Sequence, residues 1–164
     1  MGLNIGGSGS SKAYVKFNAK ADKWFVRGAD GKDAEIARPN FLVDFANIAT
    51  GWLRFREGQA PERLMDPSID QAAPSPGEGF KRGFVVMTFS PKFFGGAAEF
   101  ASASIHLANA IKDLYGEYEA GTAAHAGMLP VIGCTGSQAM KDRHGVNYRP
   151  TLQILSWAPR PAEL

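Results

Sequence analysis

The sequence has little cysteine, no long apolar run and almost no net charge, and each shortage excludes a class of protein. Cys134 is the only cysteine among 164 residues, so the chain has no intramolecular disulfide and no cysteine spacing typical of a zinc site. No apolar run approaches the ~18 residues that span a bilayer, and the start lacks the charged and apolar regions of a secretion signal. We therefore expect an intracellular, cytoplasmic protein with no membrane partner.

Candidates for catalysis are also scarce. The histidines are His106, His125 and His144, and the carboxylates are scattered along the chain. The glycine turns at 94–97 and 133–136 match neither the GxxxxGK[ST] nor the GxGxxG pattern of nucleotide-binding loops. We expect no enzyme activity, no cofactor and no metal site. A small enzyme acting on nucleotides is kept as an alternative.

The charge is unevenly distributed along the chain. The formal net charge of +2 gives too weak a field to indicate a polyanionic partner by itself. Residues 1–56 contain nine Lys and Arg against five Asp and Glu, residues 57–134 contain five against nine, and residues 135–164 contain four against two. If both ends of the chain contribute strands to one face, that face carries a basic stripe.

Short β-rich segments separated by turns dominate the pattern. They predict strands at 13–17, 23–27, 34–37, 41–48, 52–56, 81–90, 128–135 and 150–157, although 41–48 also fits a short helix. The pair Asp30-Gly31 predicts a tight hairpin turn. Apolar residues at steps of three and four from Phe100 to Tyr118 predict one helix of about six turns.

This order of elements predicts a mainly β protein with one long helix. Three strands, a helix and two strands are what a five-stranded OB-type barrel requires, with the remaining strands as insertions. An open α+β sheet with the helix on one face is the alternative. We expect a flexible Gly/Ser arm at 1–11 and a single OB-like domain at 12–161, with a Pro/Gly-rich surface loop at 57–79.

Aromatic and basic side chains alternate within the predicted strands. Lys23, Phe25 and Arg27 fall on one face of a strand, whereas Trp52 and Arg54 share one face of another. Bases stack on such rings and phosphates attract the cations, which favours single-stranded nucleic acid. The same alternation is also typical of an ordinary solvated sheet face. The residues that we expect to contact nucleic acid are Lys16, Lys23, Trp24, Arg27, Trp52, Arg54, Arg56, Arg82, Arg143, Tyr148 and Arg149.

Three separate segments carry these residues. An OB barrel binds nucleic acid across one sheet face framed by two loops, and the corresponding segments are 19–27, 52–56 and 140–148. Each segment has positive charge and at least one ring. Asp22, Asp30 and Asp33 weaken the positive charge of the first segment.

Several stretches resemble phage and prophage single-stranded DNA-binding proteins of OB type. They are KDRHGVNYRPTLQILSWAPRP at 141–161, KFNAK at 16–20, WFVR at 24–27, NIATGW at 47–52 and EGQAP at 57–61. The resemblance implies a protein that coats single strands during phage DNA replication or recombination, in a bacterial cell or phage-infected host. It also implies a homodimer or higher oligomer and contacts with replication or recombination proteins. The contact residues above come from the strand argument alone.

A second function class stays open beside this one. Aromatic patches on a sheet face can also bind another protein, so a non-enzymatic phage assembly or adaptor protein is the main alternative. Exposed apolar patches without a continuous cationic track would favour the adaptor. A deep pocket with His144 or Cys134 beside a carboxylate would favour the enzyme.

Overall fold

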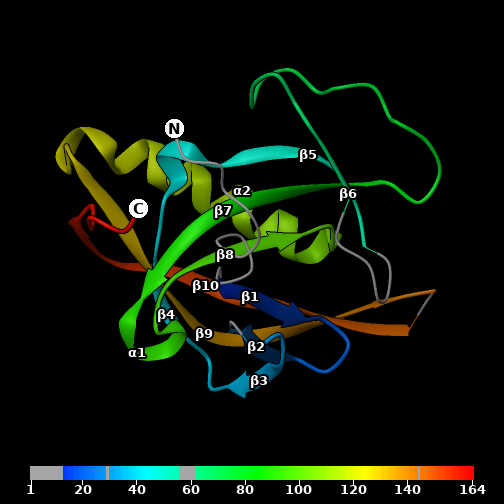
Figure 1. Cartoon of the computed structure of the whole chain (residues 1–164), viewed down its shortest axis with the longest axis horizontal. Helices are drawn as coiled ribbons and strands as arrows, with labels where there is room; N and C mark the ends of the chain where they lie inside the picture. The colour runs from blue at the N-terminus through cyan, green and yellow to red at the C-terminus, as the bar shows by residue number, and fades with distance from the viewer. Residues whose placement is uncertain (1–12, 29, 56–61, 144) are drawn as a thin grey trace.

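The computed structural model describes residues 13–28, 30–55, 62–143 and 145–164. Its strands and helices are β1 (Ala13–Asn18), β2 (Lys23–Arg27), β3 (Asp33–Ile36), β4 (Asn40–Val43), β5 (Ala49–Arg54), β6 (Glu62–Met65), β7 (Lys81–Ser90), α1 (Pro91–Phe94), β8 (Gly96–Ser102), α2 (Ile105–Gly121), β9 (Met128–Asp142) and β10 (Gly145–Pro159). Figure 1 shows a curved sheet with α2 beside it. The prediction of a mainly β protein with one long helix is confirmed.

The strands form one open sheet. Their order is β10-β9-β4-β7-β8-β1-β2-β3, with β5 paired to β7 and to β6. Neighbouring strands run antiparallel except β1 and β8, which are parallel. In the part of the chain that the structure describes, β10 and β3 end this order without pairing to each other. The expected OB barrel is therefore not confirmed, and the sheet is open.

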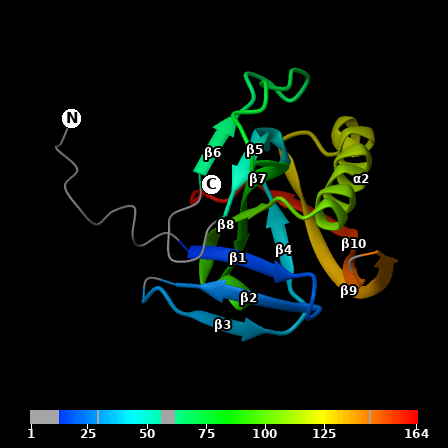
Figure 2. The ribbon, with the colours of Figure 1, turned by 90° about the vertical axis from the view of Figure 1, so that its right-hand side faces the viewer.

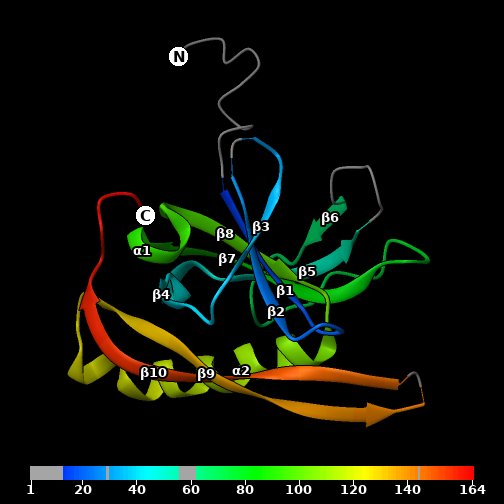
Figure 3. The ribbon, with the colours of Figure 1, turned by 90° about the horizontal axis from the view of Figure 1, so that it is seen from below.

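The two ends of the sheet diverge from the point where the β1–β2 turn lies beside the β9–β10 hairpin. Figures 2 and 3 show α2 together with the long β9–β10 hairpin on one side and the β1–β2–β3 meander on the other. The meander agrees with the predicted Asp30-Gly31 turn, since Gly31 adopts a φ of 73° and its N–H donates to the Gly28 carbonyl oxygen at 3.1 Å. None of the described helices is both long and apolar enough to cross a membrane.

Aromatic rings form the centre of the core. Trp24 is 2% exposed, and its ring lies 5.0 Å from that of Phe17, 6.0 Å from Phe41 and 5.6 Å from Phe100. Phe84 meets Phe100 edge-on at 5.3 Å. Such tilted and edge-to-face pairs are the arrangements that aromatic rings prefer. The core thus joins β1, β2, β4, β7 and β8 through rings.

The long helix begins later than the sequence predicts. Leu107, Ile111 and Leu114 of α2 are buried, as the apolar stripe requires. Phe100, however, lies in β8, which the sequence analysis did not predict as a strand. Both edges of β8 are paired, one to β7 and the other to β1, and these ladders override the helix-favouring alanines of the segment. The expected six-turn helix is therefore shortened at its start.

Three other elements differ from the prediction. The segment expected as one strand at 41–48 is split into β4 and a short 3-10 turn at Phe45–Asn47. The expected loop at 57–79 contains β6, which pairs with β5. The last two strands are longer than expected, so β9 and β10 form a hairpin that continues through most of the predicted polar loop.

Gly83 is required by the close approach of β8 to β7. A Cβ atom at this position would lie 2.2 Å from the Ser102 carbonyl oxygen and 2.8 Å from Leu53 Cδ1. We expect Gly83→Ala to lower the free energy of unfolding by about 2 kcal/mol or more, because the backbone must shift. Urea unfolding followed by circular dichroism measures this.

Gly116 provides the matched control, since a Cβ atom there would meet nothing within 4 Å and the residue lies inside α2. Gly116→Ala should raise the free energy of unfolding by up to about 1 kcal/mol. A Gly83→Ala protein as stable as the wild type would contradict the packing of β7 on β8.

Candidate nucleic-acid interface

A groove of about 440 Å³ lies where β1, β5, β7 and the segment after β8 meet. Its lining is formed by Lys16, Phe17, Leu53, Phe55, Gly79, Lys81 and residues 101–104. Two lysines and two phenylalanines thus share one concave surface, which we call the Lys16–Lys81 groove. Cations beside rings are the combination that single-stranded nucleic acid requires.

Strand pairing explains how the second half of the groove forms. Leu53 of β5 lies opposite Lys81 of β7, so the two side chains leave the sheet on the same face. Phe55, two residues beyond Leu53, continues this face and is 50% exposed. Lys81 is exposed and makes no ion pair with any described residue. This part of the groove therefore offers an exposed ring beside a lysine that no described carboxylate neutralises.

The groove continues onto the outer face of β1 and β2. Register places Tyr14 opposite Arg27 and Lys16 opposite Phe25, so these four side chains share one face. Lys23 lies on the same face, opposite Asn18. The alternation predicted for the strand at 23–27 is therefore present. Lys16 belongs both to this face and to the groove, which makes the two surfaces continuous.

Carboxylates of β3 partly neutralise this face. Asp33 accepts from Arg27 Nε at 2.8 Å and from Lys16 Nζ at 3.3 Å, and Glu35 lies 3.3 Å from Lys23 Nζ. The hydrogen bond from Arg27, aided by Lys16, holds the pKa of Asp33 below its usual value. All five side chains are substantially exposed, so these ion pairs contribute little stability and can exchange partners.

Trp24 does not belong to the surface. Its side chain points into the core and is 2% exposed, because the residue alternates with Lys23 and Phe25 along β2. The expectation that Trp24 offers a stacking surface for bases is therefore wrong. Its indole instead packs against Phe17, whose other side reaches the Lys16–Lys81 groove.

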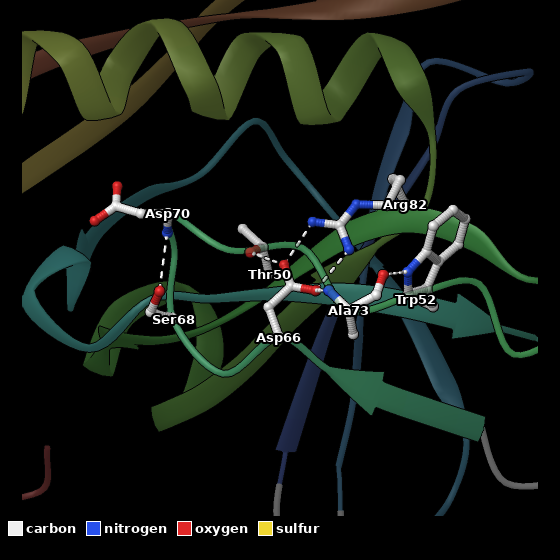
Figure 4. Close-up of polar contacts among 7 residues, drawn as sticks. All are labelled: Thr50, Trp52, Asp66, Ser68, Asp70, Ala73 and Arg82. Atoms are coloured by element: carbon white, nitrogen blue, oxygen red, sulfur yellow. Dashed lines mark hydrogen bonds and ion pairs between the residues drawn. The ribbon is translucent and has the colours of Figure 1, made fainter.

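Trp52 and Arg82 lie on the opposite face of β5 and β7 from the groove. The indole N–H of Trp52 donates to the Ala73 carbonyl oxygen at 2.6 Å, and the Arg82 guanidinium lies 5.2 Å from the Trp52 ring. The Asp66 carboxylate accepts hydrogen bonds from both terminal nitrogens of Arg82, at 2.7 and 2.5 Å. Figure 4 shows how the segment after β6 folds back over these side chains. Trp52 and Arg82 therefore do not line the Lys16–Lys81 groove, and Arg82 instead lines a second groove of about 560 Å³ between α2 and β5.

The other predicted contacts are divided between separate surfaces. Arg54 is paired with Glu62, and Arg149 donates to Asp113 of α2 at 2.6 Å. Arg143 is exposed near the tip of the β9–β10 hairpin. Arg56 lies outside the described residues.

The three predicted segments meet only in part. The backbone N–H of Tyr148 donates to the Ala19 carbonyl oxygen at 2.8 Å, and Ser137 Oγ donates to Asp22 at 2.6 Å. The hairpin therefore lies beside the β1–β2 turn, as expected. The middle segment contributes Phe55 to the groove instead of Trp52, because Phe55 follows Leu53 on the face of β5 that is opposite Trp52.

The cysteine and the histidine that were considered as catalytic candidates lie apart from the Lys16–Lys81 groove or outside the described residues. Burial raises the pKa of the Cys134 thiol, and Cys134 lines neither the Lys16–Lys81 groove nor a second groove of about 560 Å³ between α2 and β5. His144 lies outside the described residues. Across the described ranges, no group of three or more His, Cys, Asp or Glu is placed to hold a metal ion.

Asp66 anchors the segment between β6 and β7, and its charge should make stability depend on pH. Hydrogen bonds from Arg82, with further bonds from Thr50 Oγ1 and the Ala73 N–H, hold the pKa of Asp66 well below its usual value. The contribution is complete above about pH 4, the ordinary aspartate range, and is lost as the pH falls further. We expect Asp66→Asn to lower the free energy of unfolding at pH 7 by about 1 to 3 kcal/mol.

The same substitution should flatten the dependence of stability on pH below pH 4, measured by urea unfolding at several pH values. Asp70→Asn is the control, because Asp70 is exposed on the same segment and its carboxylate points away from the network (Figure 4). Equal effects of the two substitutions would show that Asp66 is not the anchor.

Comparisons with known proteins identify no relative. No family model matches the chain, and neither a curated protein nor a solved structure matches it. The candidate interface therefore rests on the geometry of the Lys16–Lys81 groove and on the adjoining face of β1 and β2.

Proposed function

We propose that the protein binds single-stranded DNA with little sequence preference and without catalysis. The observation that carries this proposal is the Lys16–Lys81 groove, in which exposed lysines flank the open ring of Phe55. Each base has a face that can stack on a ring, so recognition by stacking tolerates any sequence and contributes about 1 to 3 kcal/mol per base. The lysines supply the attraction for the phosphates.

The order of strands and helix along the chain resembles that of an OB fold, although the sheet is open. β5, β7 and β8 form a meander, α2 follows, and β9 and β10 form the final hairpin. OB folds bind oligonucleotides on the face of their second and third strands, between two loops. In this correspondence β7 and β8 are those strands, and the Lys16–Lys81 groove lies at one end of the pair, where β7 begins at Lys81 and β8 ends at Ser102.

The face of β1 and β2 gives a bound strand a path away from the groove. Lys16 and Phe25 lie side by side, followed by Tyr14 and Arg27. Neighbouring strands are about 4.8 Å apart, so the path from β5 across β7, β8 and β1 to β2 spans at most about 19 Å. We expect a footprint of only a few nucleotides, at the low end for one OB-type domain.

The setting that we propose follows the sequence resemblance. It is phage-type DNA replication or recombination in the bacterial cytoplasm, with the protein acting as a homodimer or higher oligomer alongside replication or recombination proteins. The resemblance alone supports this setting.

A protein-binding adaptor is the second candidate. Ion pairs that neutralise Arg27, Arg54 and Arg82 shorten the cationic track, and Ile69 and Leu155 are exposed by 48% and 49%. Apolar side chains on the surface suit contact with another protein. If the protein is an adaptor, its affinity for the partner protein should not depend on Lys81 or on the salt concentration.

Phe55→Ala should weaken binding of oligo-dT by about five- to a hundredfold, because one stacking surface is lost. Lys81→Glu should also weaken binding, and it should reduce the dependence of affinity on salt, because one phosphate contact is lost. Fluorescence anisotropy with labelled oligo-dT and a matched duplex, at two salt concentrations, measures both effects.

Leu155→Ala is the matched control, since Leu155 is also a large apolar residue that is half exposed, but it lies on β10 away from the groove. Its affinity should equal that of the wild type. If the wild type binds neither oligonucleotide, or if Phe55→Ala and Lys81→Glu bind as tightly as Leu155→Ala, the proposed function is wrong.

A further inference from the structure

Arg54 is held at the border of the Lys16–Lys81 groove by Glu62. Its Nε donates to Glu62 Oε2 at 2.6 Å, its Nη2 donates to the same oxygen, and its Nη1 donates to the Glu78 carbonyl oxygen at 3.2 Å. A Cβ atom on Gly79, which lines the groove, would lie 3.0 Å from Arg54 Cδ. Arg54 leaves β5 on the face of Trp52, opposite Leu53, and its side chain reaches the border of the groove at Gly79.

The Arg54 guanidinium is also fixed in orientation by a ring. It lies over Phe80, with Cζ 4.3 Å from the ring centroid. A planar guanidinium that is stacked on one side keeps its edge available for a planar or tetrahedral anion, and carboxylate and phosphate use the same hydrogen-bonding edge. Glu62 therefore occupies a position that a phosphate oxygen could also occupy.

The two arginine–carboxylate pairs of this region differ in how tightly they are held. The Asp66 side chain is 2% exposed and also accepts from Thr50 and the Ala73 N–H, so its pair with Arg82 is part of the fold. The Glu62 side chain is 39% exposed, and among the described residues Arg54 is its one recorded donor. The Arg54 side chain is 25% exposed, so this pair is partly buried, but its carboxylate reaches solvent and lacks the additional donors that hold Asp66. The Arg54 pair is the one that can open.

We propose that Glu62 is an internal competitor for the DNA backbone: a phosphate of the bound strand displaces the Glu62 carboxylate from Arg54. This inference rests on the proposed function and adds a regulated contact to it. Arg54 then binds a phosphate only after that phosphate has displaced Glu62. Phe80 and the Glu78 carbonyl keep the guanidinium in place during the exchange.

Glu62→Gln tests the competition, because glutamine keeps the shape of the side chain and removes its charge. We expect it to bind oligo-dT about two- to fivefold more tightly than the wild type, because the phosphate no longer has to displace a charged carboxylate from Arg54. The dependence of affinity on salt should become steeper by about one unit, since Arg54 is then neutralised by counterions until DNA binds. Anisotropy titrations at several salt concentrations give both quantities.

Two further variants separate competition from a general change in charge. Glu78→Gln makes the same charge change on an exposed side chain between β6 and β7, and it should alter affinity less than Glu62→Gln does. In an Arg54→Ala background, Glu62→Gln should give no greater gain than Glu78→Gln. The Nε–H NMR signal of Arg54 in the wild type should also shift when oligo-dT is added.

The outcomes separate this inference from the proposed function. If the wild type binds oligo-dT but Glu62→Gln gives no gain, or if the gain persists without Arg54, Glu62 is not a competitor. An Arg54 signal that is unchanged by DNA would overturn the inference as well. If neither the wild type nor Glu62→Gln binds, the proposed function and this inference are both wrong.

Discussion

The burial of Trp24 is the constraint on which the surface of the protein depends. Its ring is enclosed by Phe17, Phe41 and Phe100, which come from three other strands, so β2 cannot slip by one residue without exposing the core. That fixed register turns Lys23, Phe25 and Arg27 outward together. It also sets β1, whose pairing to β2 brings Lys16 to the groove. Burial of the Trp24 indole therefore determines which basic side chains lie on the outer face of β1 and β2.

Ion pairs decide how far those cations can act. Asp33 lies between Lys16 and Arg27, and Asp66 and Glu62 neutralise Arg82 and Arg54. The chain thus combines a net charge of +2 with local pairs that cancel much of its positive field. Long-range attraction of a polyanion is weak under these conditions, so the DNA affinity that we propose must come from contacts inside the groove. Lys81 gains importance because no described carboxylate compensates it.

The sequence predicts much of the sheet but not the side chains that its loops cover. Alternation along 23–27 predicts the outward face of β2, because one strand and its period determine that result. Trp52 shows the opposite case, since the strand at 52–56 has a ring on each face and no local rule chooses between them. The choice is made by Asp66, which ties the distant segment over Trp52 through Thr50 and Arg82. The strand β8 was missed for the same reason, because alanine-rich residues become a strand only between two partners.

The parallel pairing of β1 with β8 explains both the open sheet and the position of the candidate site. A sheet closes into a barrel only when its two free edges meet. Here β8 has β7 on one side and β1 on the other, so no edge of β8 remains to receive the final hairpin. The same pairing brings Lys16 and Phe17 beside the start of β7, where Lys81 and Phe55 complete the groove. The strand that keeps the sheet open therefore also supplies half of the surface on which we place the DNA.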